Sequence, residues 1–314
     1  MVEMSAFKGL TSDAFAAYTP DKWASNVHNL TRMRVKDAMV AMCDQAQQDL
    51  KEELKGLARA ATDENPNIIN HKKVDAQWVF WARDEAGRKN LATFLEKTPL
   101  DEQKLFDIAP QDKHLTVAVV IRQTEVWVGL WLAPRAVVDR RNLAAILEKT
   151  WEREQLLDLI RELPEGAMMG VQGALAPAQE ANLNLLADLA ANLGNDHPAW
   201  MVGQSIPATD AVEFGAELAD HVSRWLGALL PIYRFIAWDK ANDHIEVNKQ
   251  IQEEKAEKKR KALGFGKGDK VRIIAGVFSG KSGVVQDIDT KAQVRVLVGK
   301  MSVVVPGADL TPFA

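Results

Sequence analysis

Residues 268–298 read GDKVRIIAGVFSGKSGVVQDIDTKAQVRVLV, and residues 301–312 read MSVVVPGADLTP. Short runs rich in β-branched residues alternate with turn residues throughout this stretch. The runs are Val271–Ile274, Gly283–Ile288, Val294–Val298 and Ser302–Val305. Short strands at such close spacing are typical of a small closed sheet. We therefore predict that residues 267–314 form a small β-barrel that closes its own edges.

Three glycines, Gly276, Gly280 and Gly283, bracket a tight loop after the first of these runs. Glycine adopts positive φ angles without the steric clash that other residues meet, so we expect the loop backbone to use that freedom. The segment Asp287–Lys291 has the composition of the turn that follows. The three glycines are therefore assigned a structural role in the loop.

This pattern resembles the KOW motif of NusG-type transcription elongation factors and of a large-subunit ribosomal protein. The shared features are Gly268-Asp269, the Gly-x-Phe-x-Gly-Lys-x-Gly loop at Gly276–Gly283, and Asp-Leu-x-Pro at Asp309–Pro312. Val277 stands where the family often has proline. The resemblance covers about the last fifth of the chain and implies an SH3-like barrel that docks on RNA, on a ribosomal protein or on an RNA polymerase complex.

The same resemblance implies roles for two residues of the loop. Phe278 is expected to make an apolar or stacking contact with the partner, and Lys281 a contact with a phosphate or carboxylate. Arg272, Arg295 and Lys300 are further candidates, chosen for charge alone. Alternatively, Phe278 fills one end of the barrel, as aromatic residues of small barrels usually do, and Lys281 is merely solvated.

The stretch before the barrel is highly charged and has few apolar residues. We predict a charged helical linker over residues 239–266, which ends at the glycines after Leu263. Its basic end is a second candidate for RNA or partner binding, although such a helix is more often a soluble spacer. The basic residues there are Lys258, Lys259, Arg260 and Lys261.

Charge is unevenly distributed along the chain of 314 residues. Residues 249–314 hold 13 Lys and Arg against 7 Asp and Glu, whereas residues 1–248 hold 26 against 36. A basic tail on an acidic N-terminal part is the pattern expected if only the tail meets polyanions.

Residues 1–238 are predicted to form an acidic α+β domain in which helices pack on an antiparallel sheet. The clearest signal is a hairpin, because two apolar, β-branched runs flank the polar segment Arg122–Glu125. The expected helices cover residues 33–57, 83–96, 140–163, 176–193 and 208–233. The expected strands cover residues 76–82, 115–121, 126–132, 168–171 and 200–206.

Familiar catalytic and metal-binding motifs are missing from the sequence. The six histidines are scattered, and there is no phosphate-binding glycine loop or nucleophile elbow. The single cysteine, Cys43, lies in an apolar helical run and is expected to be buried and inert. We expect no metal and no cofactor, no membrane-spanning segment and a cytoplasmic location, which suits a chain without disulfides.

The leading hypothesis is a non-catalytic adaptor that docks through its C-terminal domain on RNA, the ribosome or the transcription machinery. The alternative is an enzyme with an active site near His71, Lys72 and Asp75, because the N-terminal part is larger than an adaptor requires. A deep pocket lined by these three side chains would favour it. A second alternative is a structural protein–protein interaction module. The N-terminal part, especially Asn70-His71-Lys72 leading to Trp78 and the hairpin strand Val126–Trp131, resembles an uncharacterised bacterial family of α+β proteins.

Overall fold

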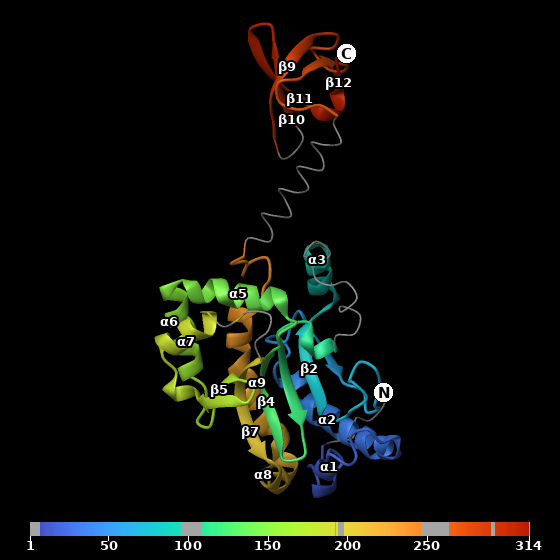
Figure 1. Cartoon of the computed structure of the whole chain (residues 1–314), viewed down its shortest axis with the longest axis vertical. Helices are drawn as coiled ribbons and strands as arrows, with labels where there is room; N and C mark the ends of the chain where they lie inside the picture. Colours follow the sequence, from blue (N-terminus) through green and yellow to red (C-terminus); the bar gives the residue numbers. More distant parts are fainter. Residues whose placement is uncertain are drawn as a thin grey trace. The chain divides into compact units, whose positions relative to one another are not determined.

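A computed structural model describes residues 7–95, 109–191, 193, 198–245, 264–289 and 293–313 (Figure 1). The chain divides into two compact units, an N-terminal unit Met1–Ile245 and a C-terminal unit Glu246–Ala314. Helices and two antiparallel sheets make it a mixed α+β protein, as predicted.

The N-terminal unit is built on a seven-stranded sheet with the strand order β1-β2-β3-β4-β7-β5-β6. Every neighbouring pair of strands is antiparallel. The predicted hairpin is confirmed, because Thr116 pairs with Trp131 and Ile121 with Val126. The strands are β1 Leu57–Ala61, β2 Gln77–Arg83, β3 Thr116–Ile121, β4 Glu125–Leu132, β5 Met168–Val171, β6 Ala174–Pro177 and β7 Trp200–Pro207.

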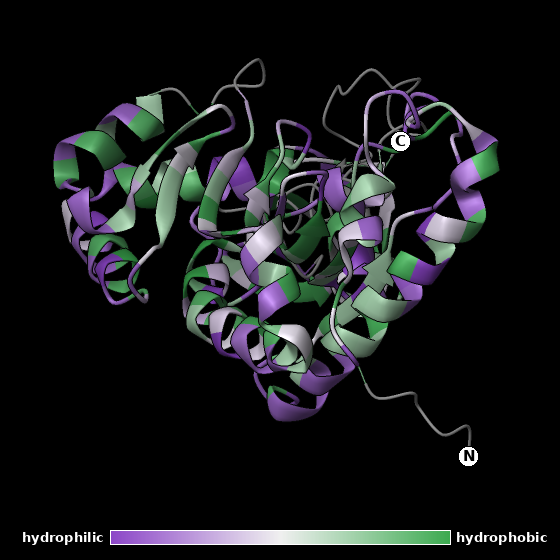
Figure 2. Ribbon diagram, turned by 90° about the horizontal axis from the view of Figure 1, so that it is seen from below, coloured by the Kyte–Doolittle hydropathy of each residue, from purple (hydrophilic) through white to green (hydrophobic). Residues whose placement is uncertain are grey.

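Two long helices, α2 Asn29–Asp49 and α9 Leu218–Ile236, pack on each other; α2 also packs on β2, and α9 on β3, β4 and β7. In Figure 2 the helical ribbons alternate between hydrophobic and hydrophilic residues, as expected for helices with one buried face. The remaining α-helices are α1 Ser12–Ala16, α3 Glu85–Leu95, α5 Val137–Glu148, α6 Thr150–Arg161, α7 Leu183–Ala191 and α8 Ala208–Glu213. The 3-10 turns are η1 Asn26–His28, η2 Pro110–Asp112, η3 Ala178–Glu180, η4 Gly215–Glu217 and η5 Gly307–Asp309.

Both faces of the seven-stranded sheet are buried at its centre. In β4, Val126, Val128 and Leu130 point to the core that the helices share, whereas Trp127 and Trp131 belong to a second cluster on the opposite face. Side chains on a strand alternate between faces, so a strand with two buried faces reads as a continuous apolar run. This explains why β3 and β4 gave the clearest strand signal in the N-terminal part.

Some elements of this unit differ from the prediction. Strand β1 begins at the end of the predicted helix 33–57, and β6 overlaps the start of the predicted helix 176–193. The predicted helix 208–233 is broken into α8 and α9 at Gly215, where φ is +53°. A Cβ on Gly9 would lie 2.9 Å from the Gly215 backbone, so the break is also a site of close chain packing.

The C-terminal unit contains a five-stranded antiparallel sheet with the order β11-β10-β9-β8-β12. Its apolar core includes Val271, Val285, Val294 and Val296. Strand pairing leaves β11 and β12 as two separate edges, so the predicted closure of the sheet is not found among the described residues. The strands are β8 Lys270–Ile273, β9 Ser282–Ile288, β10 Gln293–Val298, β11 Met301–Pro306 and β12 Leu310–Pro312.

Most of the predicted linker helix, residues 246–263, lies outside the described residues. The described part of that prediction, residues 239–245 and 264–266, consists of turns, bends and irregular backbone rather than helix. Asn242 holds the first of these segments in place, because its side-chain amide donates to the carbonyls of Phe235 and Ala237, each at 2.9 Å. Among the described helices, none is long and apolar enough to cross a membrane.

Candidate interaction surface of the C-terminal unit

The loop between β8 and β9, residues 274–281, is closed by its own hydrogen bonds. The Ile273 amide donates to the Lys281 carbonyl (2.9 Å), and the Gly280 amide donates to the Ile273 carbonyl (2.8 Å). Ser279 adds two bonds, from its amide to the Gly276 carbonyl (3.1 Å) and from its hydroxyl to the Ile274 carbonyl (3.1 Å). The loop is therefore ordered before any partner binds, which lowers the entropy cost of binding.

The three loop glycines serve two different purposes. Gly276 and Gly280 have φ angles of +79° and +82°, in the region that favours glycine. Gly283 lies where strands approach closely, and a Cβ there would come within 2.5 Å of the Leu297 carbonyl oxygen. Replacing Gly283 would therefore separate β9 from β10, whereas replacing Gly276 or Gly280 would strain the loop itself.

The loop presents an apolar tip, but the exposed residue at that tip is not the predicted one. Phe278 is half-buried and packs against the core of the unit. This agrees in part with the alternative prediction that Phe278 is a core residue. Val277 is 96% exposed, and Ile274 beside it is 56% exposed. Sequence reasoning treated Val277 only as a departure from the family pattern; its position directly after Gly276, inside the Gly276–Gly280 turn, was the available signal.

The predicted cationic residues lie on several elements of the C-terminal unit, and Arg295 lies opposite Asp287 near the far end of β9. Lys281 is the last residue of the loop and is exposed, and Arg272 is exposed on β8 opposite Ser282. Arg295 is exposed on β10, and Lys300 lies in the turn before β11. None of the four forms an ion pair with another described residue. Their charges are therefore available to an anionic partner. Lys258, Lys259, Arg260 and Lys261 lie outside the described residues.

The residues of the enzyme alternative do not converge on one cavity. His71 and Lys72 are exposed and have positive φ angles of 53° and 59°, which are uncommon outside glycine. Asn67 holds this turn, because its carbonyl accepts from the Lys72 amide at 2.7 Å. The adjacent hollow, of about 120 Å³, is lined by Asp75 but by neither His71 nor Lys72. The deep pocket that would favour this alternative is not formed by the three side chains together.

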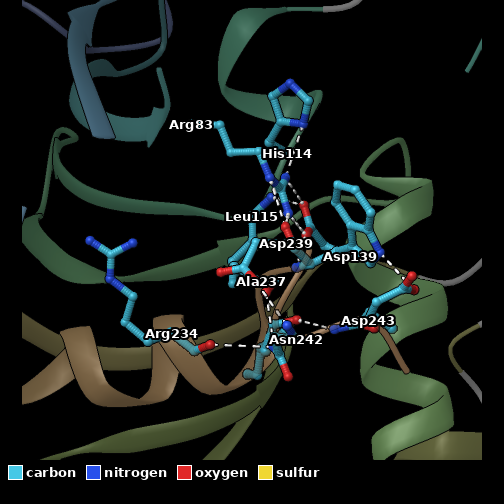
Figure 3. Close-up of polar contacts among 12 residues, drawn as sticks. Arg83, His114, Leu115, Asp139, Arg234, Ala237, Asp239, Asn242 and Asp243 are labelled. Carbon is cyan, nitrogen blue, oxygen red and sulfur yellow. Dashed lines mark hydrogen bonds and ion pairs between the residues drawn. The ribbon is translucent and has the colours of Figure 1, made fainter. Parts of the chain in front are cut away.

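Sequence reasoning missed a buried charged cluster in the N-terminal unit (Figure 3). Arg83 at the end of β2 pairs with Asp139 on α5, and His114 lies beside them before β3. The Asp139 carboxylate also accepts from the backbone amides of Leu115 (2.8 Å) and Trp238 (2.9 Å). These contacts join β2, α5, the start of β3 and the segment after α9 at one point.

The cluster has little capacity left for a ligand. A guanidinium has five N–H donors, and those of Arg83 are used by Asp139, His114 Nδ1 (3.3 Å) and the Trp238 carbonyl (2.6 and 3.1 Å). The carboxylate oxygens of Asp139 are each bonded twice. A buried cluster of perturbed groups can indicate catalysis, but this one is saturated by the protein and therefore serves as a structural anchor.

The pKa values of the cluster follow from burial and charge. Burial lowers the pKa of His114 to about 4; because a guanidinium only donates, the His114 Nδ1 that faces Arg83 must be unprotonated. Burial alone would raise the pKa of Asp139, but the Arg83 charge and hydrogen bonds outweigh it and lower that pKa. Asp139 and Arg83 therefore stay charged and His114 stays neutral at pH 7.

Neither a reactive cysteine nor a metal-binding group of side chains is found in the described part of the chain. Cys43 is fully buried, and burial raises the pKa of its thiol to about 12, so the reactive thiolate is not populated near neutral pH. No group of three or more His, Cys, Asp or Glu residues within the described ranges is arranged to hold a metal ion.

Comparison of the sequence with models of protein families and with curated proteins gave no match.

Proposed function

We propose that the protein is a non-catalytic adaptor that docks through its C-terminal unit on a ribonucleoprotein or on the transcription machinery. The observation that carries this proposal is the hydrogen-bonded loop 274–281, which holds Val277 almost fully exposed at its tip. An apolar side chain on a rigid loop contributes to binding without a large ordering cost. The KOW-like residues of the loop support an SH3-like module as the docking fold.

The unpaired cations support an anionic partner surface. Arg272, Lys281, Arg295 and Lys300 form no ion pairs with described residues, and the C-terminal part of the sequence is net basic. Such charges raise the association rate with a polyanion and make binding depend on salt. The apolar tip and the unpaired cations together suit a partner surface that contains both protein and RNA.

The test uses the full chain and two matched valines. Val277→Ser removes an apolar side chain from the loop tip, whereas Val27→Ser removes one that is 86% exposed in the N-terminal unit. Both variants are measured for co-sedimentation with purified ribosomes and for capture by purified RNA polymerase. We expect the wild type to bind one of these assemblies and Val277→Ser to bind it at least about tenfold more weakly, a loss of about 1.4 kcal/mol. Val27→Ser should bind like the wild type.

Two results would refute the proposal. One is that the wild type binds neither assembly, and the other is that both serine variants bind as tightly as the wild type. A separate experiment measures the contribution of RNA through the salt dependence of binding. Lys281→Gln should reduce the salt slope by about one counterion if Lys281 contacts a phosphate, and an unchanged slope would assign the contact to protein.

A further inference from the structure

Strand β11, Met301–Pro306, is an open edge of the C-terminal sheet. Among the described residues it pairs only with β10, and no other described backbone group bonds to it. It carries no charged residue. Natural edge strands are usually protected by charges, bulges or a covering element, because an unprotected edge pairs readily with another strand.

The turn before β11 determines which backbone groups face outward. Gly299 has a φ of +63° and opens the two-residue turn that joins Val298 to Met301, as in hairpin turns with glycine first. Such a turn is closed by a hydrogen-bonded pair, and antiparallel ladders alternate between bonded and non-bonded pairs. Ser302 and Val304 therefore point their amide and carbonyl groups away from β10.

The side chains of this edge are also open to solvent. Val304 is 60% exposed, Ser302 is exposed, and the Ser302 hydroxyl is bonded to Gln286 on β9 rather than to anything outside the sheet. Pro306 ends the strand and has no amide hydrogen. The free donors of the edge are therefore two amides, those of Ser302 and Val304, two residues apart.

We infer that β11 pairs in antiparallel fashion with β11 of a second copy of this chain, about a two-fold axis at Val303. In this register Ser302 lies opposite Val304 of the second copy, and Val304 opposite its Ser302. Each pair exchanges two N–H···O bonds, so both free amides of each edge gain an acceptor. The two sheets become one continuous sheet with an isologous interface.

The side chains fit this register without placing like charges opposite each other. On the outer face, Val304 lies between Arg295 of its own β10 and Ser302 of the second copy. That Ser302 in turn lies beside Leu297 of the second copy's β10, as the β10–β11 register requires. Lys300 lies opposite Pro306 of the second copy. Val303 meets its own equivalent, and an apolar pair across strands is stabilising. The strand is thus complementary to itself.

A pairing of two short edges buries little surface, so the dimer is expected to be weak and to depend on concentration. The pairing does not rest on the proposed docking function, because the edge and the loop 274–281 are different parts of the unit. It would add to that function, since two linked docking loops bind a repeated or extended target more tightly than one.

The test measures the mass of the full chain by sedimentation equilibrium from about 10 µM to about 1 mM, the range in which weak contacts are populated. The wild type should rise from the monomer mass of 34.8 kDa towards twice that value. Val304→Pro removes an outward amide hydrogen but no bond to β10, since proline is tolerated where the N–H faces solvent. It should stay at the monomer mass.

Val304→Thr is the matched control, because it keeps the outward amide and suits a strand, and it should dimerise like the wild type. Val304→Lys is a second blocking variant, in which a charge on the edge opposes pairing, and it decides the outcome if the proline variant unfolds. A wild type that remains monomeric throughout would overturn the inference. So would folded proline and lysine variants that dimerise as the wild type does.

Discussion

The two sheets of this protein are buried to different extents. In the N-terminal unit all six residues of β3 are buried, so that sheet is covered on both faces at its centre. In the C-terminal unit the strands alternate, and β8 reads exposed, buried, exposed, buried. A sheet with two buried faces needs partners from its own chain, whereas a sheet with one exposed face can offer that face to others. The difference is in keeping with the proposed function, in which the second sheet belongs to the docking unit.

The described ion pairs are also distributed unequally between the two units. Within the described ranges, every ion pair lies in the N-terminal unit, and the most buried of them joins Arg83 to Asp139. The described cations of the C-terminal unit have no such partners. Removing charges should therefore destabilise the first unit and weaken binding by the second.

The largest expected effect is the loss of the buried pair. Asp139→Asn leaves the Arg83 charge buried without its carboxylate, which typically costs about 3–5 kcal/mol of folding free energy. The measurement is urea unfolding of the full chain, followed by tryptophan fluorescence because the core of the N-terminal unit contains Trp81 and Trp200. Glu152→Gln is the control, since its partner Lys149 is half-exposed and such pairs contribute about 0–1 kcal/mol. A cost below about 1 kcal/mol for Asp139→Asn would contradict the anchor role.

Acid should destabilise the N-terminal unit through His114. In the unfolded chain this histidine becomes protonated as the pH falls through 6.5, whereas in the folded state it becomes protonated only near pH 4. Stability is therefore complete above pH 6.5 and falls between pH 6.5 and 4, by at most about 3 kcal/mol. The lowered pKa of Asp139 acts below this window.

The check is thermal unfolding at a series of pH values. His114→Asn cannot be protonated, so the variant should lose less stability between pH 6.5 and 4 than the wild type. Equal slopes for the two proteins would show that His114 does not control the acid response. His221 and His244 also have lowered pKa values, so some dependence on pH should remain in the variant.

A smaller effect is expected from the close packing of β4 and β7. Gly203 pairs with Gly129, and a Cβ on Gly203 would lie 2.2 Å from the Val128 carbonyl oxygen. Gly203→Ala should therefore cost about 1–3 kcal/mol, as overpacking does. Gly266→Ala in the C-terminal unit is the control, because the nearest atom to its added Cβ is 3.9 Å away. Similar unfolding midpoints for the two variants would contradict the close packing of β4 against β7 at Gly203.

Sequence predicted the elements whose own residues decide their structure. The hairpin β3–β4, strand β5 and strand β7 have strong apolar or β-branched runs, and their prediction is confirmed. Strand β1, LARAA, and strand β6, ALAP, consist largely of residues that favour helices in isolation. Their pairing with β2 and β5 overrides that preference, and a single sequence does not reveal such pairing.

The candidate site shows the same limit at the level of single residues. The glycine spacing indicated the loop, and Gly276 and Gly280 have the positive φ angles expected there. The burial of Phe278 and the exposure of Val277 depend on how the loop folds back on the sheet, which spacing does not encode. The Arg83–Asp139 pair joins residues far apart in the sequence, so only the three-dimensional structure reveals it.

The proposed docking role is tested most directly by amide hydrogen exchange of the full chain, measured with and without purified ribosomes or RNA polymerase. Binding is expected to slow exchange in loop 274–281 and in the adjoining ends of β8 and β9, and the N-terminal sheet is expected to exchange at the same rate in both states. Slower exchange in the hollow around Asp75 and Trp78, with no change in loop 274–281, would contradict the proposed docking role and place the binding site in the N-terminal unit.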